Sequence, residues 1–217
     1  SEEPFSPTDL RLLDSVAAQT GLALENGRLT EAIKEEARAR EKHNRELELG
    51  REVQERLFPQ EFPAIPGLDY AGACRPALGV GGDYYDFLPM PNGGLGIAIG
   101  DVSGKGIPAA LLMATLRAFL RGQAIDQETD LGAVITNLNR LVFESSAQNR
   151  YATFFLGTYD SASRVLRYVN AGHNAPMVIR AGNEVVRLEA SGSVVGLLRG
   201  GAWEPGHVKL ERGDLLV

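Results

Sequence analysis

The strongest constraint on the fold is a long segment, residues 7–58, which has no proline after its first residue and becomes densely charged after its first half. Ser6 and Asp9 have the three-residue spacing of a capping box, and an apolar repeat follows them. This pattern predicts a helix that begins at residue 7. Prolines at positions 59, 63 and 66 end the region, because proline cannot continue a helix interior. At about 1.5 Å per residue, the predicted helix is roughly 75 Å long.

A helix of that length has nothing of its own to pack against. Its apolar residues recur in a heptad-like seam formed by Leu10, Leu13, Ala17, Thr20 and Leu24. Two interpretations are open: a solvated helix that lies on its own domain, or a parallel coiled coil with a second copy of the chain. We favour the coiled coil and expect a homodimer through this helix.

Composition excludes several classes of protein. The 217 residues carry a net charge of -6, and 44% of them are hydrophobic, which is enough for a substantial core. No run approaches the ~20 apolar residues that a membrane-spanning helix needs. We also expect no signal peptide, because residues 1–10 lack a basic start and an apolar run. The acidic balance and the lack of a basic patch argue against nucleic acid. The single cysteine, Cys74, favours a reducing cytoplasm, so we expect a cytoplasmic protein without a membrane partner.

After residue 66 the sequence changes to short apolar runs separated by glycines, a pattern typical of strands. We expect strands over residues 68–74, 95–101, 152–159, 165–170, 176–180, 184–188, 206–210 and 214–217. Residues 164–170 and 177–180 look like consecutive antiparallel partners. Residues 107–120, apolar nearly all round, predict a buried helix, and residues 131–142 predict an amphipathic one. Adjacent helices inside a run of strands indicate an α+β sandwich with mainly antiparallel sheets.

Two acidic, glycine-flanked turns are the candidates for chemistry. One is VGGDYYDF at 80–87, and the other is GDVSGKG at 100–106, directly after the apolar run 95–99. Glycine lets the backbone approach a ligand closely, and an aspartate at a strand end can present its carboxylate there. Such oxygen donors suit Mg²⁺ or Mn²⁺ better than zinc. Asp83 and Asp101 are therefore candidate metal ligands, although the spacing alone equally allows them to cap turns.

Competing motifs fail on inspection. The Gly-Lys pair at 104–105 lacks both the first glycine and the final Ser or Thr of a P-loop. Cys74 has no arginine at the sixth position after it, which excludes a cysteine-phosphatase loop. No serine sits in a nucleophile elbow, and the three histidines lack zinc-ligand spacing. The context of His173 favours a histidine in a turn that hydrogen-bonds to the backbone. A role for His173 in the site stays open.

Together these segments resemble the SpoIIE/RsbU-like bacterial branch of the PPM (type 2C) serine/threonine phosphatases. The matching pieces, in family order, are VGGDYYDF at 80–87, GDVSGKGIPAALLMA at 100–114, Asn139, VNAGHNAPM at 169–177 and ERGDLLV at 211–217. The resemblance implies a PPM-type sandwich of two mainly antiparallel sheets flanked by helices, preceded by the long helix. The resemblance also argues against the alternative in which Asp83 and Asp101 only cap turns. Within the first motif, we interpret Asp86 as a residue that stabilises the loop.

The resemblance also implies a metal-dependent phosphatase with two Mn²⁺ or Mg²⁺ ions in the complete protein. The expected substrate is phosphoserine or phosphothreonine on a STAS-type anti-sigma-factor antagonist. By motif, Asp83 and Asp101 are the catalytic metal ligands, with the Val102 carbonyl as a third contact. Lys105 and Arg75 are candidates for binding the phosphate, since cations pair strongly with it.

The domain division follows the same resemblance. Residues 1–30 resemble the last helix of a GAF sensor domain, 31–60 a helical coiled-coil signalling linker, and 61–217 a PPM-type phosphatase domain. In the family, a segment like GDLLV leads into a Thr-Asp-Gly turn that binds metal, so we expect a C-terminally incomplete, inactive fragment that binds at most one metal weakly. The alternatives are a pseudophosphatase that only binds a partner, and a coiled-coil dimerisation element with a passive domain.

Overall fold

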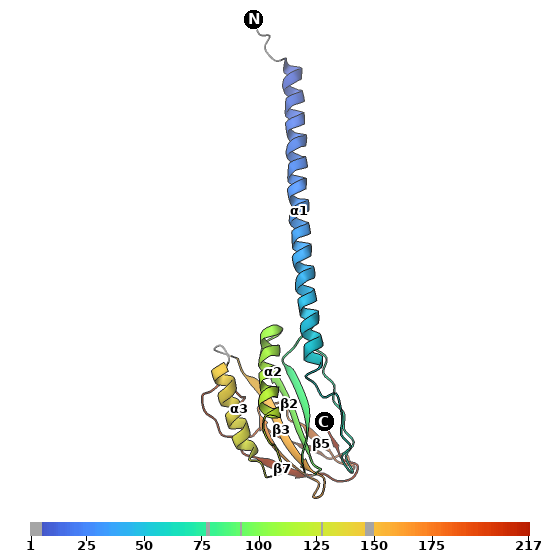
Figure 1. The fold of residues 1–217 in the computed structure, drawn as a ribbon, viewed down its shortest axis with the longest axis vertical. Helices are drawn as coiled ribbons and strands as arrows, with labels where there is room; N and C mark the ends of the chain where they lie inside the picture. Colours follow the sequence, from blue (N-terminus) through green and yellow to red (C-terminus); the bar gives the residue numbers. More distant parts are fainter. Residues whose placement is uncertain (1–5, 77–78, 92, 127, 146–149) are drawn as a thin grey trace. The chain divides into compact units, whose positions relative to one another are not determined.

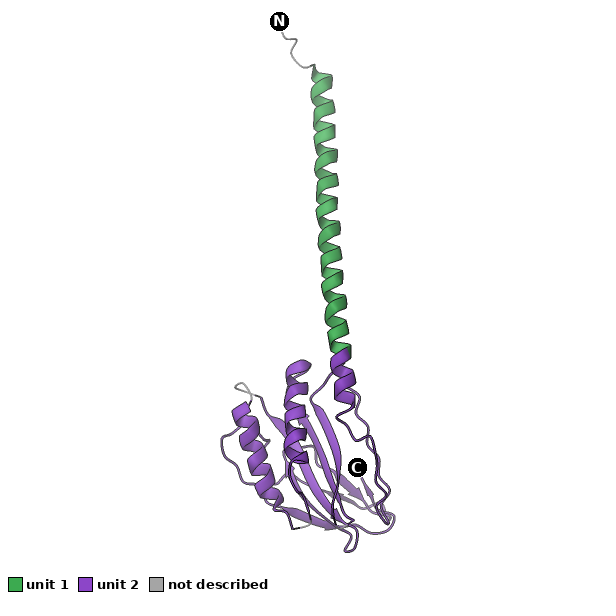
Figure 2. Cartoon of the chain, viewed as in Figure 1, with its two compact units in different colours: residues 1–48 green, residues 49–217 purple. Residues whose placement is uncertain are grey.

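The structure is a computed structural model that describes residues 6–76, 79–91, 93–126, 128–145 and 150–217. The chain divides into two compact units, Ser1–Glu48 and Leu49–Val217 (Figure 2). Helix α1 (Pro7–Glu55) begins in the first unit and ends in the second. The predicted capping box is confirmed: the Asp9 N–H donates to Ser6 Oγ at 3.3 Å, and the Ser6 N–H donates to Asp9 Oδ2 at 2.9 Å.

The second unit contains two antiparallel sheets (Figure 1). The five-stranded sheet has the order β1 (Asp83–Pro89), β2 (Leu95–Val102), β3 (Ala152–Asp160), β4 (Val165–Ala171) and β7 (Gly206–Lys209). The three-stranded sheet has the order β6 (Val185–Arg187), β5 (Met177–Ile179) and β8 (Leu215–Leu216). Neighbouring strands in both sheets pair antiparallel, which confirms the expected α+β class.

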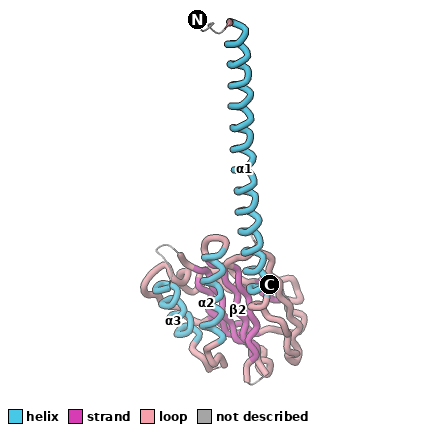
Figure 3. The backbone as a smooth tube through the Cα atoms, turned by 45° about the horizontal axis from the view of Figure 1, so that its top comes forward, coloured by secondary structure: helices cyan, strands magenta, loops and turns pink. Residues whose placement is uncertain are grey.

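Helices α2 (Ile107–Arg121) and α3 (Leu131–Ser145) lie side by side on one face of the large sheet (Figures 1 and 3). Their buried side chains recur at helical spacing and join one core with alternate residues of the strands, such as Tyr84, Ala98 and Val102. The other face of the large sheet contributes Phe87, Leu95 and their neighbours to a second core, which includes Val178 from the small sheet. The chain therefore forms three layers: helices, large sheet and small sheet.

Several elements differ from the sequence-based expectation. The segment 68–74 was expected as a strand but has no ladder partner, and it is a loop in which Gly72 lies against the Tyr85 ring. A Cβ at Gly72 would lie 2.4 Å from that ring, so the segment packs against β1 through its backbone. Conversely, residues 80–87 were interpreted as a glycine-flanked turn, but Asp83–Pro89 form β1. The strand is hidden in the sequence because one of its buried positions carries the polar residue Asp86.

The expected pairing of residues 164–170 with 177–180 is wrong, since β4 and β5 belong to different sheets. The cause is a sharp change of direction at Gly172, whose φ of 68° favours glycine and whose Cα lies against Val194. The α2 helix was expected to be buried all round, but Ile107 and Leu111 on its outer face are exposed. Helix α3 has the amphipathic face that its sequence predicts.

Among the described residues, no helix combines the length and apolar character needed to cross a bilayer.

Candidate metal centre

The register of three neighbouring strands brings the predicted aspartates together. Asp83, the first residue of β1, lies directly opposite Asp101 near the end of β2, and Asp101 lies opposite Thr153 on β3. Directly opposed residues of antiparallel strands project on the same face, so the three side chains form a row along one edge of the sheet. Both aspartates are exposed to solvent. The fold thus provides two accessible carboxylates from segments 18 positions apart in the sequence.

Gly82, the residue before Asp83, lies close against the backbone of Val102 at the end of β2. A Cβ at position 82 would lie 2.6 Å from the Val102 carbonyl oxygen and 3.0 Å from the Val102 Cβ. The Val102 N–H also donates to the Gly82 carbonyl oxygen at 3.3 Å. Only glycine therefore permits this approach, which brings the Val102 carbonyl beside the residue that precedes Asp83. The predicted trio of Asp83, Asp101 and Val102 is brought together.

The electrostatics of the row favour a bound cation. Burial raises the pKa of Asp101 above its ordinary value, and the charge and hydrogen bonding of Asp83 raise it further, whereas His173 lowers it. Two carboxylates this close repel each other when both are ionised, and a divalent cation would relieve the repulsion. Carboxylate and carbonyl oxygens are also the donors that Mg²⁺ and Mn²⁺ accept. The residues present therefore fit such an ion.

The described part of the chain supplies only a partial ligand set. Within residues 6–76, 79–91, 93–126, 128–145 and 150–217, no group of three or more His, Cys, Asp or Glu side chains is arranged to hold a metal. Lys105 lies in the turn after β2, and Arg75 lies in the loop before β1; both are exposed. No hydrogen bond or ion pair joins either cation to Asp83 or Asp101 in the described structure, so their predicted phosphate contacts stay predictions.

His173 adjoins this row, and its environment could not be inferred from the sequence. Its Nδ1 lies 2.8 Å from Thr153 Oγ1, on the strand next to Asp101. Burial lowers the pKa of the His173 ring, while the charges of Asp101 and Asp83 act to raise it. The sequence signal was the Asn-Ala-Gly-His motif, but its link to Asp101 depends on the register between β2 and β3.

Asp86 has a different role from the other aspartate of its motif. It is fully buried on the opposite face of β1, where the Tyr84 hydroxyl donates to its Oδ2 at 2.9 Å and Arg121 Nε donates to the same oxygen at 2.8 Å. The Phe87 N–H donates to Oδ1 at 2.9 Å. Asp86 therefore connects β1 to the end of α2, and its carboxylate is not available to the Asp83–Asp101 row.

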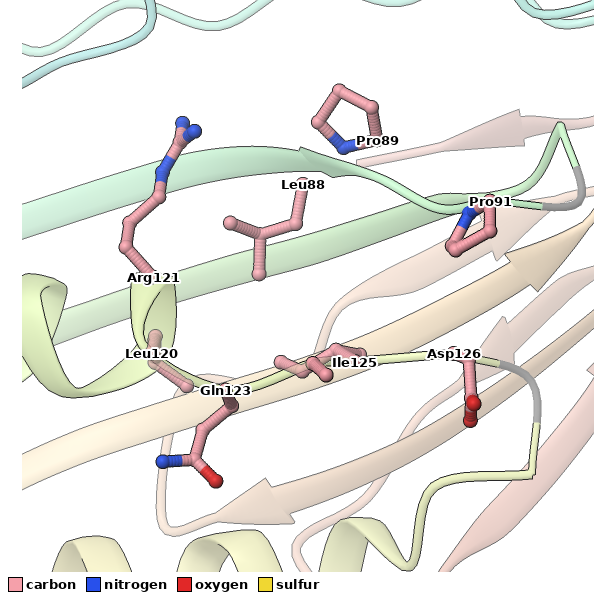
Figure 4. Close-up of a pocket in the computed structure, with 9 residues that line it drawn as sticks. Leu88, Pro89, Pro91, Leu120, Arg121, Gln123, Ile125 and Asp126 are labelled. Atoms are coloured by element: carbon pink, nitrogen blue, oxygen red, sulfur yellow. The ribbon is translucent and has the colours of Figure 1, made fainter.

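A cavity of about 280 Å³ lies at the other end of β1 from Asp83 (Figure 4). Its lining includes Leu88 and Pro89 of β1, together with Arg121 and the loop that follows α2. Figure 4 shows the Arg121 side chain extending past Leu88 toward β1. Since Asp86 already binds this guanidinium, the cavity offers no free charge from Arg121 to a ligand.

Comparison with known proteins finds relatives of this chain in both sequence and fold. Residues 91–217 match the sequence profile of the family described as Stage II sporulation protein E (SpoIIE). The curated protein phosphoserine phosphatase RsbU of Bacillus subtilis is 30% identical over 99% of this chain, and the chain spans 63% of the length of RsbU. The match to RsbU extends over both compact units.

Two solved structures show the same fold. The SiaA PP2C domain of Pseudomonas aeruginosa superimposes with a TM-score of 0.69 at 22% identity, covering 82% of this chain and 71% of that domain. RsbX, solved in complex with magnesium, has a TM-score of 0.52 at 16% identity and covers 62% of this chain and 63% of RsbX. The three-layer arrangement is therefore the PP2C fold.

Proposed function

This chain belongs to the SpoIIE family, and on that premise we propose that it is the phosphatase part of a metal-dependent enzyme that hydrolyses phosphoserine or phosphothreonine in a protein. The observation that supports the proposal most is the row in which Asp83 and Asp101 face each other at the edge of the sheet. A protein that only binds a phosphorylated partner would not need two repelling carboxylates at one edge. The name of RsbU, a phosphoserine phosphatase, agrees with this chemistry.

The chain's own residues would hold the metal through the Asp83 and Asp101 carboxylates and the Val102 carbonyl. When bound, Mg²⁺ or Mn²⁺ lowers the pKa of a coordinated water and neutralises charge on a phosphoryl group. Two such ions are expected in the complete protein, and the magnesium in RsbX is consistent with this class of metal. Asp101 supplies negative charge at the site, and the exposed Lys105 and Arg75 offer charge to the substrate phosphate.

We take a phosphorylated STAS-type regulator as the substrate, because the resemblance to the SpoIIE/RsbU-like phosphatases implies it. The test is release of inorganic phosphate from a phosphoserine-bearing STAS protein by the full-length protein, with and without Mn²⁺. We expect release only with the metal. Tight binding of the phosphoprotein without any release would instead identify a partner-binding pseudophosphatase.

Control by the N-terminal helix is part of the proposal. We assign residues 1–30 to the end of a GAF-like sensor and 31–60 to a signalling linker. Gln54, near the end of α1, is buried and bonds the backbone of Gly81 twice: its Nε2 donates to the Gly81 carbonyl at 2.7 Å, and its Oε1 accepts the Gly81 N–H at 3.0 Å. Gly81 is two residues before Asp83, so the end of the helix is connected to the first candidate ligand.

Replacing Gln54 with alanine should therefore lower metal-dependent turnover by about 10-fold, since small misplacements of catalytic groups are costly. The reason is that the Gly81 N–H and carbonyl lose their shared partner and the start of β1 is no longer fixed. Phosphate release and thermal unfolding of the full-length protein measure the effect. Glu52→Ala, which alters an exposed side chain of the same helix, is the matched control and should behave as the parent does. Equal activity of both variants would show that the helix is only a tether.

The first unit supports a homodimer. Leu10, Leu13 and Leu24 of the predicted seam are 54%, 55% and 66% exposed, which is costly for apolar side chains in water. We therefore propose that two copies of α1 cover each other as a parallel coiled coil. Light scattering should give twice the monomer mass, and Leu13→Glu with Leu24→Glu should halve it. A parent that stays monomeric at about 50 μM contradicts the dimer, because stable coiled coils associate well below that concentration.

A further inference from the structure

A loop beside the candidate metal centre is packed tightly between the large sheet and α3. Val195 pairs with Ala152, the first residue of β3, and each N–H donates to the other's carbonyl oxygen at 2.9 Å. The next residue, Gly196, adopts a φ of 85°, which favours glycine, and a Cβ at this position would clash with Val142 of α3. Residues 195–198, the 195–198 loop, therefore start from a fixed backbone.

A buried side chain of α3 fixes the rest of this loop. Asn139 is only 2% exposed. Its Oδ1 accepts the Gly196 N–H at 2.7 Å, and its Nδ2 donates to the Leu198 carbonyl at 3.1 Å. Both ends of the Asn139 amide are thus used by the loop backbone, and the loop cannot move away without leaving a buried amide unsatisfied.

The fixed loop exposes two adjacent leucines. Leu197 is 47% exposed and Leu198 is 56% exposed, and the exposed Arg199 follows them. A slack loop can turn its apolar side chains inward, but the two bonds to Asn139 hold the backbone on both sides of Leu197. Neighbouring apolar side chains held in water by a rigid backbone indicate a surface that contacts a partner.

The loop lies two strand positions from the candidate metal centre. Val195 pairs with Ala152, and Ala152 pairs with Val102 of β2. Since neighbouring strands are about 4.8 Å apart, Val102 and Val195 are separated by roughly 10 Å, which an extended peptide covers with about three residues. A side chain three or four residues from a phosphorylated residue can therefore reach the loop while the phosphate lies at the row of Asp83 and Asp101.

Arg150 lies between the loop and the glycine-rich turn that follows β2. A Cβ at Gly104 of that turn would lie 3.1 Å from Nη1 of Arg150, and a Cβ at Gly196 of the loop would lie 3.4 Å from the Arg150 carbonyl oxygen. The exposed Lys105 adjoins Gly104, and the exposed Arg199 follows the loop. Although the whole chain has a net charge of -6, the surface from the turn to the loop thus carries cations.

We propose that the 195–198 loop is the docking surface for the phosphoprotein substrate, where Leu197 and Leu198 contact apolar side chains a few residues from the phosphorylated one. The inference rests on the proposed function, because it places the substrate phosphate at the row of Asp83 and Asp101. The apolar loop and the cations beside it fit a segment that combines exposed apolar side chains with the negative charge of a phosphate.

Two substrates of different size separate docking from chemistry. The full-length double variant Leu197→Ser, Leu198→Ser is compared with the parent on a phosphoserine-bearing STAS protein and on p-nitrophenyl phosphate, both with Mn²⁺. We expect the KM for the phosphoprotein to rise about 10- to 100-fold and its kcat to stay within about 3-fold, because the lost contacts are remote from the reacting phosphate. The small ester cannot reach the loop, so its KM and kcat should stay within about 3-fold of the parent.

The matched control is Val185→Ser, which removes a side chain that is 49% exposed on β6 of the small sheet. It should leave the kinetics of both substrates unchanged. An unchanged KM for the phosphoprotein in the double variant would overturn the proposal. Equal losses on both substrates would overturn it too, because they would show damage to the site itself. So would a dimer that dissociates in the double variant by light scattering, since the loop would then contact a second copy of the chain.

Binding without metal distinguishes failure of this inference from failure of the proposed function. With a chelator present the phosphoprotein is not hydrolysed, and isothermal titration calorimetry measures docking alone. We expect the double variant to bind it at least about 10-fold more weakly than the parent. Loop-dependent binding by a protein that never releases phosphate would reject only the phosphatase function. Phosphate release by a parent whose double variant binds the phosphoprotein equally well would reject only the docking surface, as would a parent that does not bind it without metal.

Discussion

Replacing Asp101 with asparagine should reduce metal-dependent phosphate release by the full-length protein more than about 100-fold, beyond the loss typical of residues that act only through a ligand. Asparagine keeps the size of the side chain but removes the negative charge that a divalent cation requires. The assay is phosphate release over a range of Mn²⁺ concentrations. Asp83→Asn should give a similar loss, because Asp83 is the residue directly opposite Asp101.

The same variant should be slightly more stable than the parent when metal is removed by a chelator. The pKa of Asp101 is raised above its ordinary 3.8, so its contribution to stability is present below that value and is lost as pH rises through the raised pKa. At pH 7 the ionised Asp101 therefore disfavours folding. Since the side chain is exposed, the gain in Asp101→Asn is small, about 2 °C in Tm.

This opposite effect on stability separates loss of chemistry from loss of fold. An inactive Asp101→Asn variant that melts at or above the parent temperature has lost a ligand. Normal activity of this variant would contradict the assignment of the site, and a large drop in Tm would show that Asp101 has a structural role instead.

Replacing Arg121 with methionine should destabilise the chain by about 3 kcal/mol, because it leaves the buried Asp86 carboxylate without its cation. We place the value at the low end of the range for buried ion pairs because the Arg121 side chain is 38% exposed. For a chain of this size, the loss corresponds to a decrease in Tm of about 6–12 °C, measurable by calorimetry.

The matched control is the double variant Asp86→Asn, Arg121→Met. The asparagine oxygen can take the place of Oδ1 and accept from the Phe87 N–H, and its amide nitrogen can donate to the Tyr84 hydroxyl oxygen, but no charge remains to be compensated. The double variant should recover part of the lost stability. A single variant as stable as the parent would show that the pair is not needed for the fold. The experiment tests why the first motif carries two aspartates, one for the site and one for the scaffold.

Local sequence patterns predicted most elements of the fold. The capping box at Ser6, the proline start of α2 and the apolar face of α3 depend on neighbouring residues, and all three are present. The strand β1 was missed because Asp86 interrupts its apolar pattern, and the cation that compensates this buried charge is Arg121, 35 positions away. The segment 68–74 failed for the converse reason: an apolar pattern without a ladder partner does not form a strand.

The candidate site was predictable only in part. Asp83 begins β1 and Asp101 lies near the end of β2, each beside glycines, so their motifs identified them separately. Their pairing, and the place of His173 next to Thr153, depend on strand register, which residue patterns do not specify when the side chains are polar. The bonds from Gln54 to Gly81 join residues 27 positions apart and have no local signal either.

Diffraction at the manganese absorption edge tests the central claim most directly. Crystals of the full-length protein grown with Mn²⁺ should show an anomalous peak within coordination distance of the Asp83 and Asp101 carboxylates, about 2.0–2.3 Å from an oxygen of each. The peak should disappear in Asp101→Asn crystals grown in the same way. A manganese peak bound by other residues, with none at the Asp83–Asp101 row, would contradict the account.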